Sequence, residues 1–412
     1  MKALVLAGGF PQISLIEKLR ERGIITILAD YSEDPVARVY ADKFYRISTL
    51  DVDAIRDLAA AENVDIIITV CTDQALLTAA QVSEDLGLPC YIDHRTAKNV
   101  TNKAFMKRML SENNIPTSRY IAAESFDKII GSGLKFPLIV KPADCNSSKG
   151  VRRVDNDAEL EDAFNDAVKF SRTNTAVVEE YIPGKELSVD VYVENGSAVV
   201  LDITTSEKIK IKDRFIIFRT WHPANISERI RLKTEQIAQQ IADVFEIKDS
   251  PMLIQLLADD DEAYVIEFSA RTGGGVKHLS IERRTGVDIV SAVIDLTLKQ
   301  KPHIAVRDPA AGYMVDEYIY CKPGIYDHME GFEALKKNGI ITDHYVFKCK
   351  GAVFDSIGSS GDRIGGFTVE GNSIQELQEK YKLVNDSVKI ISADGTDIMR
   401  HDLLADFDVS GS

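Results

Sequence analysis

The chain has 412 residues, of which 45% are hydrophobic and 27% are charged. This composition is ordinary for a folded protein, and the length leaves room for two or three domains with cores of their own. Acidic residues outnumber basic ones by 64 to 49, so the formal net charge is −15. Such a charge argues against broad binding of nucleic acids or anionic membranes, and any anion must therefore be held by a local site.

The cysteines and the apolar stretches favour a reducing, aqueous compartment. The five cysteines form no C-x-x-C pair, which argues against a disulfide framework or a zinc site. The apolar run in the opening "MKALVLAGG" is too short for a signal peptide, and no apolar stretch reaches the ~18 residues of a membrane span. We expect a cytoplasmic protein with no nucleic-acid partner and no membrane partner.

Short apolar runs alternate with helical patterns over residues 1–100, from "KALVLAGG" through "ISLIEKLRERG" and "IITILAD" to "DIIITV". This alternation is typical of βαβ units and predicts a Rossmann-like domain. The first turn, "AGGFPQ", has Gly8 and Gly9 without a full G-x-G-x-x-G, and Asp30 ends the second expected strand. Three interpretations stay open: a weak dinucleotide site, a small anion at the N-terminus of the first helix, or a tight turn alone.

Residues 101–305 mix helices with antiparallel strands. A helix is expected over "NKAFMKRMLSENNI", and Asn195-Gly196 is a strong two-residue hairpin signal between later strands. A second helix, "ERIRLKTEQIAQQIADVF", leads into the hairpin "MLIQLLADDDEAYVIEFSA". Residues 306–412 follow "QKPHIAVRDP" as a smaller α+β segment. The fold class is therefore α/β in the N-terminal domain and α+β in the rest of the chain.

Lys141 ends the expected strand in "KFPLIVKPADCNSSKGV" and precedes a loop of small and polar residues. Backbone N–H groups, hydroxyls and a second cation in such a loop can bind phosphate oxygens. The alternative is a strand lysine whose stem is packed and whose ammonium reaches the edge.

The segment "VVEEYIPGKELSVD" joins two expected strands through residues 179–186. An edge of this kind can present backbone donors and acceptors that match adenine, and Glu186 can accept hydrogen bonds from ribose hydroxyls. The alternative is a strand crossing whose glutamates are solvated.

The stretch "VIEFSARTGGG" begins as a buried strand and ends in three glycines. Because side chains alternate along a strand, Glu267, Ser269 and Arg271 share one face. A three-residue turn through residues 260–262 would place Gln255 directly across from Glu267. Magnesium takes one or two carboxylates together with substrate phosphates, so Glu267 fits as its ligand. The alternative is a salt bridge from Glu267 to Arg271.

In their order and spacing these pieces resemble the ATP-grasp superfamily of carboxylate-amine ligases over essentially the whole chain. The resemblance rests on the Rossmann-like start, "NKAFMKRML", the strand lysine with its loop, "EEYIPGKE", and "Q-x11-E-F-S-A-R-T-G-G-G". It implies a pre-ATP-grasp domain at 1–100, an ATP-grasp domain at 101–305 with a lid at about 115–200, and a C-terminal α+β domain at 306–412. The closest resemblance within the superfamily is to L-amino-acid ligases and biotin-carboxylase-like purine enzymes.

The resemblance also implies which residues bind the nucleotide. Lys103 and Lys141 would contact phosphates, the loop from Ser147 to Gly150 would cover them, and residues 179–186 would hold adenine and ribose. The implied ATP-binding residues are Lys103, Lys141, Ser147, Ser148, Lys149, Gly150, Glu179, Glu180, Tyr181, Ile182 and Glu186.

A second set of residues is implied for the metal and the chemistry. Lys141, Glu267 and Arg271 would be catalytic, with Glu267 on the metal and Arg271 on the reacting acyl phosphate. The implied metal ligands are Gln255, Glu267 and Ser269, and the implied substrate contacts are Arg271, Gly273, Gly274, Gly275 and His222. For His222, in "TWHPAN", the alternative is a packed histidine beside Trp221.

Two positions depart from the family pattern, which has a second carboxylate where Gln255 stands and an asparagine where Ser269 stands. The site is therefore one negative charge poorer, which affects magnesium affinity or the number of metal ions.

The implied activity uses ATP and Mg²⁺, with Mn²⁺ as a substitute, to activate a carboxylate as an acyl phosphate and join it to an amine. Its partners would be small-molecule carboxylates and amines, and a homodimer stays open. The alternatives are a purine-pathway or carboxylase-like enzyme of the same superfamily and a nucleotide-binding protein that has lost catalysis.

Overall fold

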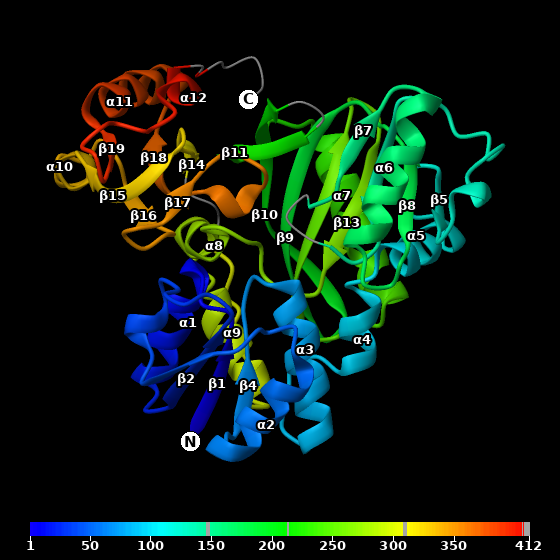
Figure 1. The fold of residues 1–412 in the computed structure, drawn as a ribbon, viewed down its shortest axis with the longest axis horizontal. Helices are drawn as coiled ribbons and strands as arrows, with labels where there is room; N and C mark the ends of the chain where they lie inside the picture. The colour runs from blue at the N-terminus through cyan, green and yellow to red at the C-terminus, as the bar shows by residue number, and fades with distance from the viewer. Residues whose placement is uncertain (146–148, 212–213, 308–310, 406, 408–412) are drawn as a thin grey trace.

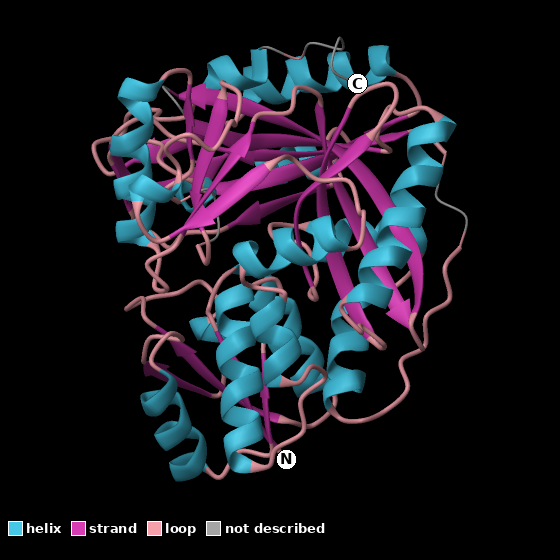
Figure 2. Cartoon of the chain, turned by 90° about the vertical axis from the view of Figure 1, so that its right-hand side faces the viewer, coloured by secondary structure: helices cyan, strands magenta, loops and turns pink. Residues whose placement is uncertain are grey.

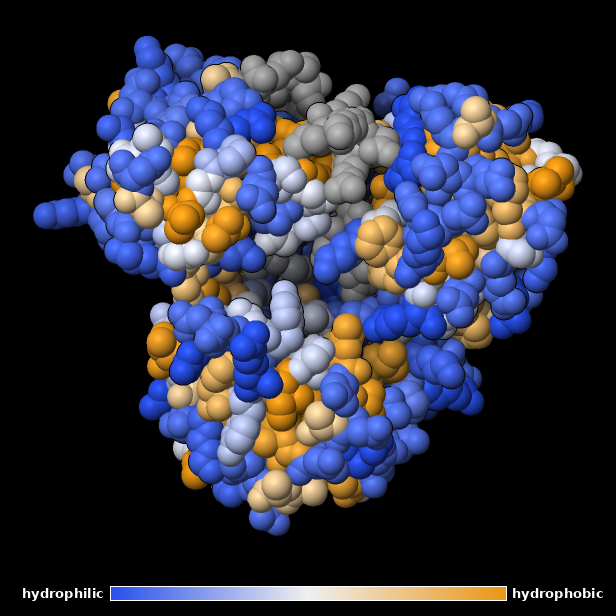
Figure 3. Space-filling view, viewed as in Figure 1, coloured by the Kyte–Doolittle hydropathy of each residue, from blue (hydrophilic) through white to orange (hydrophobic). Residues whose placement is uncertain are grey.

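The computed structural model describes residues 1–145, 149–211, 214–307, 311–405 and 407. These residues form three lobes, two above and one below in the view of Figure 1. Figure 3 shows that the surface is hollowed where the three lobes meet. No helix within the described ranges is both long and apolar enough to cross a bilayer.

The N-terminal lobe is built on a parallel four-stranded sheet in the order β3-β2-β1-β4. Its strands are β1 (Lys2–Leu6), β2 (Ile25–Asp30), β3 (Lys43–Arg46) and β4 (Ile66–Ile68). The helices that pack on it include α1 (Phe10–Glu21), α2 (Val52–Glu62) and α3 (Asp73–Leu86), while α4 (His94–Asn99) follows α3 and packs toward a second, larger sheet through Ala97. Strands β1 and β4 are almost entirely buried because helices cover both faces of the sheet. The expected βαβ alternation is confirmed.

Two helices from later in the chain connect this lobe to the others. They are α8 (Lys277–Thr285), which lies where the lobes meet in Figure 1, and α9 (Ile289–Thr297), which lies in the lower lobe beside α1. The apolar face of α9, with Val290 and Val293, shares one buried core with Val5 and Leu15. A segment expected in the central domain therefore completes the packing of the N-terminal sheet.

The largest element is an eight-stranded sheet in the order β13-β12-β9-β10-β11-β14-β18-β16. Its strands are β9 (Lys185–Glu194), β10 (Ser197–Ile211), β11 (Arg214–His222), β12 (Ser250–Ala258), β13 (Ala263–Ser269), β14 (Tyr313–Ile319), β16 (Asp343–Val346) and β18 (Gly365–Gly371). The expected hairpin turn is confirmed, because Asn195 and Gly196 join β9 to β10 with φ of 52° and 81°. Helices α5 (Lys103–Glu112) and α7 (Glu228–Val244) pack on this sheet.

The lid sheet is a separate four-stranded sheet, in the order β5-β8-β6-β7, on the right of Figure 1. Its strands are β5 (Tyr120–Ala123), β6 (Leu138–Pro142), β7 (Arg152–Val154) and β8 (Ala176–Glu180). Helix α6 (Asp157–Phe170) covers one face through buried Leu160 and Phe164. Figure 2 shows the long strands of the large sheet crossing the upper part of the molecule, above the N-terminal helices.

The last segment adds a small three-stranded sheet, β17-β15-β19, and continues the large sheet. Its remaining elements are β15 (Gly324–Glu330), α10 (Phe332–Lys337), β17 (Val353–Phe354), α11 (Ile374–Ser387), β19 (Lys389–Ser392) and α12 (His401–Ala405). The large sheet thus crosses the expected limit at residue 306, since β14 pairs with β11. The domain limits themselves stay predictions.

Candidate functional site

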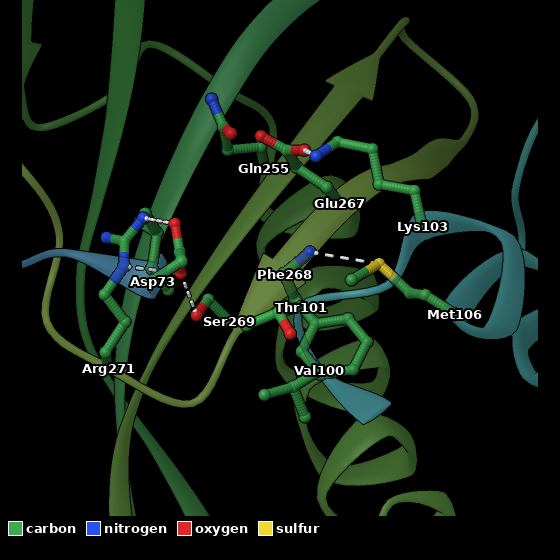
Figure 4. A pocket seen from close by; sticks show the side chains of 11 residues that line it. Asp73, Val100, Thr101, Lys103, Met106, Gln255, Glu267, Phe268, Ser269 and Arg271 are labelled. Carbon is green, nitrogen blue, oxygen red and sulfur yellow. Dashed lines mark hydrogen bonds and ion pairs between the residues drawn. The ribbon is translucent and has the colours of Figure 1, made fainter. Parts of the chain in front are cut away.

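Strands β12 and β13 place the two residues singled out in the sequence directly opposite each other. Gln255 pairs with Glu267 in the antiparallel register, as expected. The turn is longer than the three residues expected, because Ala258 pairs with Ala263. A bulge after Gln255 then shifts the register by one residue and restores the expected pair. Figure 4 shows the Gln255 amide oxygen and the Glu267 carboxylate turned toward the same side of one pocket.

Lys103 reaches this pocket from the first turn of α5. The helix begins there because the Asn102 side chain accepts from the Phe105 N–H as its N-cap. Lys103 Nζ lies 3.0 Å from Glu267 Oε2 and donates to the Cys145 carbonyl at 2.6 Å. Burial disfavours the charged ammonium, but the neighbouring Glu267 outweighs burial and raises the pKa of Lys103. The lysine therefore enters the site as a cation.

Arg271 is held by Asp73, a residue that the sequence analysis missed. Its Nε and Nη2 donate to the two Asp73 oxygens at 2.7 and 2.6 Å, which is a bidentate pair. The salt bridge from Glu267 to Arg271 that was considered from sequence is replaced by this pair. Ser269 also donates its hydroxyl to Asp73, so its role as a metal ligand stays a prediction. Asp73 opens α3 just after β4, and a carboxylate at the carboxyl end of a parallel strand is a signal that could have identified it.

The lid sheet contributes Lys141, which shares a buried carboxylate with a second lysine. Lys141 Nζ lies 2.5 Å from Glu179 Oε1, and Lys107 Nζ lies 2.5 Å from Glu179 Oε2. Burial acts against ionisation of Glu179, but the two lysines outweigh it and lower its pKa to about 2. Glu179 was expected beside adenine, and here it is the common anion of two cations. Lys107 was not identified from sequence, although it stands on the same face of α5 as Lys103, one turn later.

The segment between the lid and the large sheet carries the residues expected to bind adenine and ribose. Glu180 accepts from Arg119 and from the Lys135 N–H, while the Tyr181 ring stacks under a guanidinium from β7. Ile182 lies half-buried in the link that follows β8. Glu186, at the start of β9, is paired with Lys208 and accepts from Gln255 Nε2 at 3.4 Å. These positions line one edge, and their nucleotide contacts stay predictions.

The loop after Lys141 is only partly described. Ser147 and Ser148 lie outside the described residues. Lys149 is exposed, and Gly150 has φ +70°, where an added Cβ would lie 2.9 Å from Phe170 and from Pro142. A side chain at position 150 would therefore be strained, so the backbone conformation and packing explain a glycine here even without a ligand.

The three glycines after Arg271 form a turn with close neighbours. A Cβ at Gly273 would lie 2.8 Å from Asp190 Oδ1, and one at Gly275, where φ is +67°, would overlap the Tyr318 hydroxyl. Gly274 faces open space and is exposed. Packing alone thus requires two of the three glycines, and their contact with a substrate stays a prediction.

His222 is fully buried between two carboxylates. Its Nδ1 lies 2.5 Å from Asp202 and its Nε2 lies 2.9 Å from Asp316. Because both ring nitrogens have protein partners, the geometry favours the packed-histidine alternative over a direct substrate contact.

The first turn of the N-terminal lobe has a structural explanation. Both oxygens of Asp30 accept backbone N–H groups, from Gly8 at 2.7 Å and Ser32 at 2.7 Å. A Cβ at Gly8 would lie 2.6 Å from Pro35. An acid that is already satisfied in this way is not free to hold a ribose, which disfavours the dinucleotide interpretation.

Comparison with known proteins identifies the fold. Residues 134–279 match the ATP-grasp domain family, so the chain contains an ATP-grasp domain. An L-amino acid ligase from Bacillus licheniformis superposes with a TM-score of 0.79 and 22% identity, covering 95% of this chain and 98% of that one. A phosphoribosylglycinamide synthetase from Anaerococcus prevotii gives 0.75 and 19%, covering 95% and 99%. The fold class expected from sequence is confirmed.

Solved structures of this fold include nucleotide complexes. The biotin carboxylase domain dimer of Hydrogenobacter thermophilus 2-oxoglutarate carboxylase, in complex with MgADP, ADP and bicarbonate, has a TM-score of 0.78 and 18% identity. The match covers 98% of this chain and 92% of that one.

Curated relatives match over a shorter stretch. A formate-dependent phosphoribosylglycinamide formyltransferase of Sulfurisphaera tokodaii is 27% identical over 249 residues, which cover 58% of this chain and 62% of the relative. The large chain of a Pyrococcus furiosus carbamoyl phosphate synthase is 24% identical over 299 residues, covering 70% of this chain and 28% of that one. The chain thus spans about three fifths, or less, of the length of the first curated relatives it matches.

Proposed function

We propose that the protein is an ATP-dependent ligase that activates a carboxylate as an acyl phosphate and joins it to an amine, with release of ADP and phosphate. One observation carries the proposal: cations and a carboxylate from separate parts of an ATP-grasp fold converge on one pocket. Lys103 comes from α5, Glu267 from β13, and Arg271 follows β13 with its guanidinium held by α3. Such an inventory suits phosphoryl transfer, where positioning and neutralisation of charge matter more than acid-base chemistry.

Binding of ATP would use the lid and the body together. Lys141 has no hydrogen-bond acceptor in good geometry among the described residues, although it lies in an ion pair with Glu179. Its remaining N–H groups are therefore available to phosphate oxygens. The edge that runs from Glu180 to Glu186 would receive adenine and ribose.

The pocket fits magnesium, or manganese in its place, with few protein ligands. The described residues contain no cluster of three or more His, Cys, Asp or Glu that could hold a metal. Asp73 is taken by Arg271, which leaves the Glu267 carboxylate and the Gln255 amide oxygen on one side of the pocket. Magnesium commonly binds through one or two carboxylates plus substrate phosphates, and it would neutralise charge on the transferred group.

The reaction would proceed in two balanced steps. A carboxylate oxygen of the first substrate attacks the γ-phosphorus of ATP, the bond to the β-phosphate oxygen breaks, and ADP leaves. The amine then attacks the acyl carbon, phosphate leaves, and the amine loses a proton. Arg271 would bind the acyl phosphate, and its bidentate pair with Asp73 fixes the plane of the guanidinium.

The substrates would be a small carboxylate and a small amine. The similarity to an L-amino acid ligase and to purine-related enzymes supports both the peptide-like reaction and the alternative, a purine-pathway or carboxylase-like reaction. The two share the acyl-phosphate step, so one assay covers both.

The test is carboxylate-dependent release of ADP and phosphate, screened over amino acids and small carboxylates. Hydroxylamine in place of the amine should trap the acyl phosphate as a hydroxamate. Glu267→Gln should abolish both signals, while Glu112→Gln, on the exposed side of α5, should leave them unchanged. Formation of AMP in step with product would rule out the acyl-phosphate route.

A further inference from the structure

The ratio of cations to carboxylates differs between two parts of the candidate site. Lys103 is paired with Glu267, Arg271 with Asp73, and Lys208 with Glu186. Each of these cations has one carboxylate of its own. In the lid, by contrast, one carboxylate serves two lysines, and the buried group of Lys107, Glu179 and Lys141 has a net charge of +1.

Lys107 is fully engaged by the protein. Its Nζ donates to Thr117 Oγ1 at 2.7 Å and to Ser118 Oγ at 2.8 Å, and it contacts Glu179 Oε2. The side chain is 1% exposed. An ammonium has three donors, so Lys107 has none left for a ligand.

Lys141 is in the opposite situation. It faces the same carboxylate from the other side, yet it has no hydrogen-bond acceptor in good geometry among the described residues. It is the penultimate residue of β6, close to the loop that was expected to cover phosphates. The positive charge that Glu179 does not neutralise is therefore located on the ammonium of Lys141.

We propose that Lys107 is a positioning residue for nucleotide binding, which neutralises Glu179 so that the charge of Lys141 is free for a phosphate. This inference rests on the proposed function, because it presumes that Lys141 meets a nucleotide. Without Lys107, Glu179 would bind Lys141 alone, and the group would become neutral. Lys107 then acts entirely through its neighbours and touches no ligand itself.

A competing explanation is purely structural. Lys107 also lies within 3.4 Å of the Val265 carbonyl of β13, and Thr117 donates to that same carbonyl at 2.7 Å. The lysine therefore links α5 to the segment that enters the lid sheet. Loss of this link would disturb the lid whatever the charge on Glu179, so the experiment must separate geometry from charge.

The experiment is calorimetric titration of ADP, in the presence of magnesium, into the wild type and four variants of the full chain. Lys107→Met should weaken ADP binding by about tenfold, since a charge-assisted contact of Lys141 is lost to Glu179. Adding Glu179→Gln to Lys107→Met should restore most of the affinity, because the charge of the group returns to +1. Lys107→Arg should bind nearly as well as the wild type, and Lys98→Met, at an exposed position of α4, should be unchanged.

Two results would overturn the role of Lys107. One is unchanged ADP affinity in Lys107→Met, and the other is a double variant as weak as the single one, which would indicate the structural link alone. If Lys107→Met does not fold, the double variant decides by itself: near-wild-type affinity supports the proposal, and a tenfold loss overturns it. Absence of nucleotide binding by the wild type would instead reject the proposed function.

Discussion

The two sides of the candidate site differ in how they carry charge. On the body side, Lys103 and Arg271 each have a carboxylate of their own, Glu267 and Asp73, so this side is neutral as built. On the lid side two lysines share Glu179, and a positive charge remains. The body side can accept a cation only through a carboxylate that already has a partner, whereas the lid side is ready for an anion. The difference indicates which half would receive the metal and which the phosphates.

The largest expected effect comes from removing the carboxylate of the body side. Glu267→Gln keeps the shape but leaves Lys103 without its anion and the metal without a charged ligand. We expect carboxylate-dependent ADP release to fall by about 1000-fold, in line with the loss of one strong electrostatic contact to a transition state. Steady-state kinetics over a wide range of magnesium concentrations measures this. Recovery of activity at high magnesium would mean that Glu267 contributes affinity alone.

The next effect concerns the free cation of the lid side. Lys141→Ala should weaken ATP binding by about 10- to 100-fold, the range for loss of a charge-assisted contact worth roughly 1.5 to 3 kcal/mol. The fold should survive, because Glu179 keeps Lys107 as its partner. Calorimetry with ATP and a thermal melt measure both points. An ATP dissociation constant equal to that of the wild type would make Lys141 a strand lysine without a ligand.

The two sides also differ in how many of their contacts could be predicted from the sequence. The strand pattern of "VIEFSARTGGG" placed Glu267 across from Gln255, and the pairing holds although a bulge compensates for a longer turn. Local patterns of this kind are set by the alternation of side chains, which the sequence shows directly. The expected carboxylate at Glu267 and cation at Lys103 therefore met in one pocket.

Partners from distant segments could not be predicted in this way. Asp73 stands 198 positions before Arg271, and Lys107 lies 72 positions before Glu179 in the sequence, so no local period connects them. Glu179 was placed beside adenine because nothing in its own segment revealed two buried lysines. The fold class followed from repeated local patterns, while these pairings depend on how three sheets pack together.

A smaller effect is expected on the body side from a change at Gln255. Gln255→Glu adds a carboxylate beside Glu267, and we expect the magnesium concentration for half-maximal activity to fall several-fold by Coulomb attraction. The gain is limited because Glu186 lies 3.4 Å from the Gln255 amide and would repel the new charge. The measurement is activity against magnesium concentration. An unchanged magnesium dependence with a higher Michaelis constant for the substrate would place Gln255 on the substrate.

The smallest effect is a pH dependence that arises on the lid side. Burial disfavours the charged form of Lys107, and although Glu179 opposes this, the pKa is lowered to about 8. The charged groups that face Lys107 are Glu179 from β8, Lys141 from β6 and, further away, Glu267 from β13. As the pH rises through about 8, Lys107 loses its proton and the net charge of its group falls from +1 to zero.

We therefore expect the ADP affinity of the wild type to decrease by about fivefold between pH 7 and 9, because Lys107 goes from about one tenth to about nine tenths deprotonated. Unfolding does not explain such a loss, since a lysine whose pKa is lowered in the folded state makes stability rise with pH between about 8 and 10.5. The phosphates of ADP, whose last pKa lies near 6, stay ionised throughout this range. Calorimetry at several pH values with Lys107→Arg as the control decides the matter, because a guanidinium keeps its proton and the affinity should stay flat. An equal decline in the arginine variant would assign the titration to another group and remove the pH argument for Lys107.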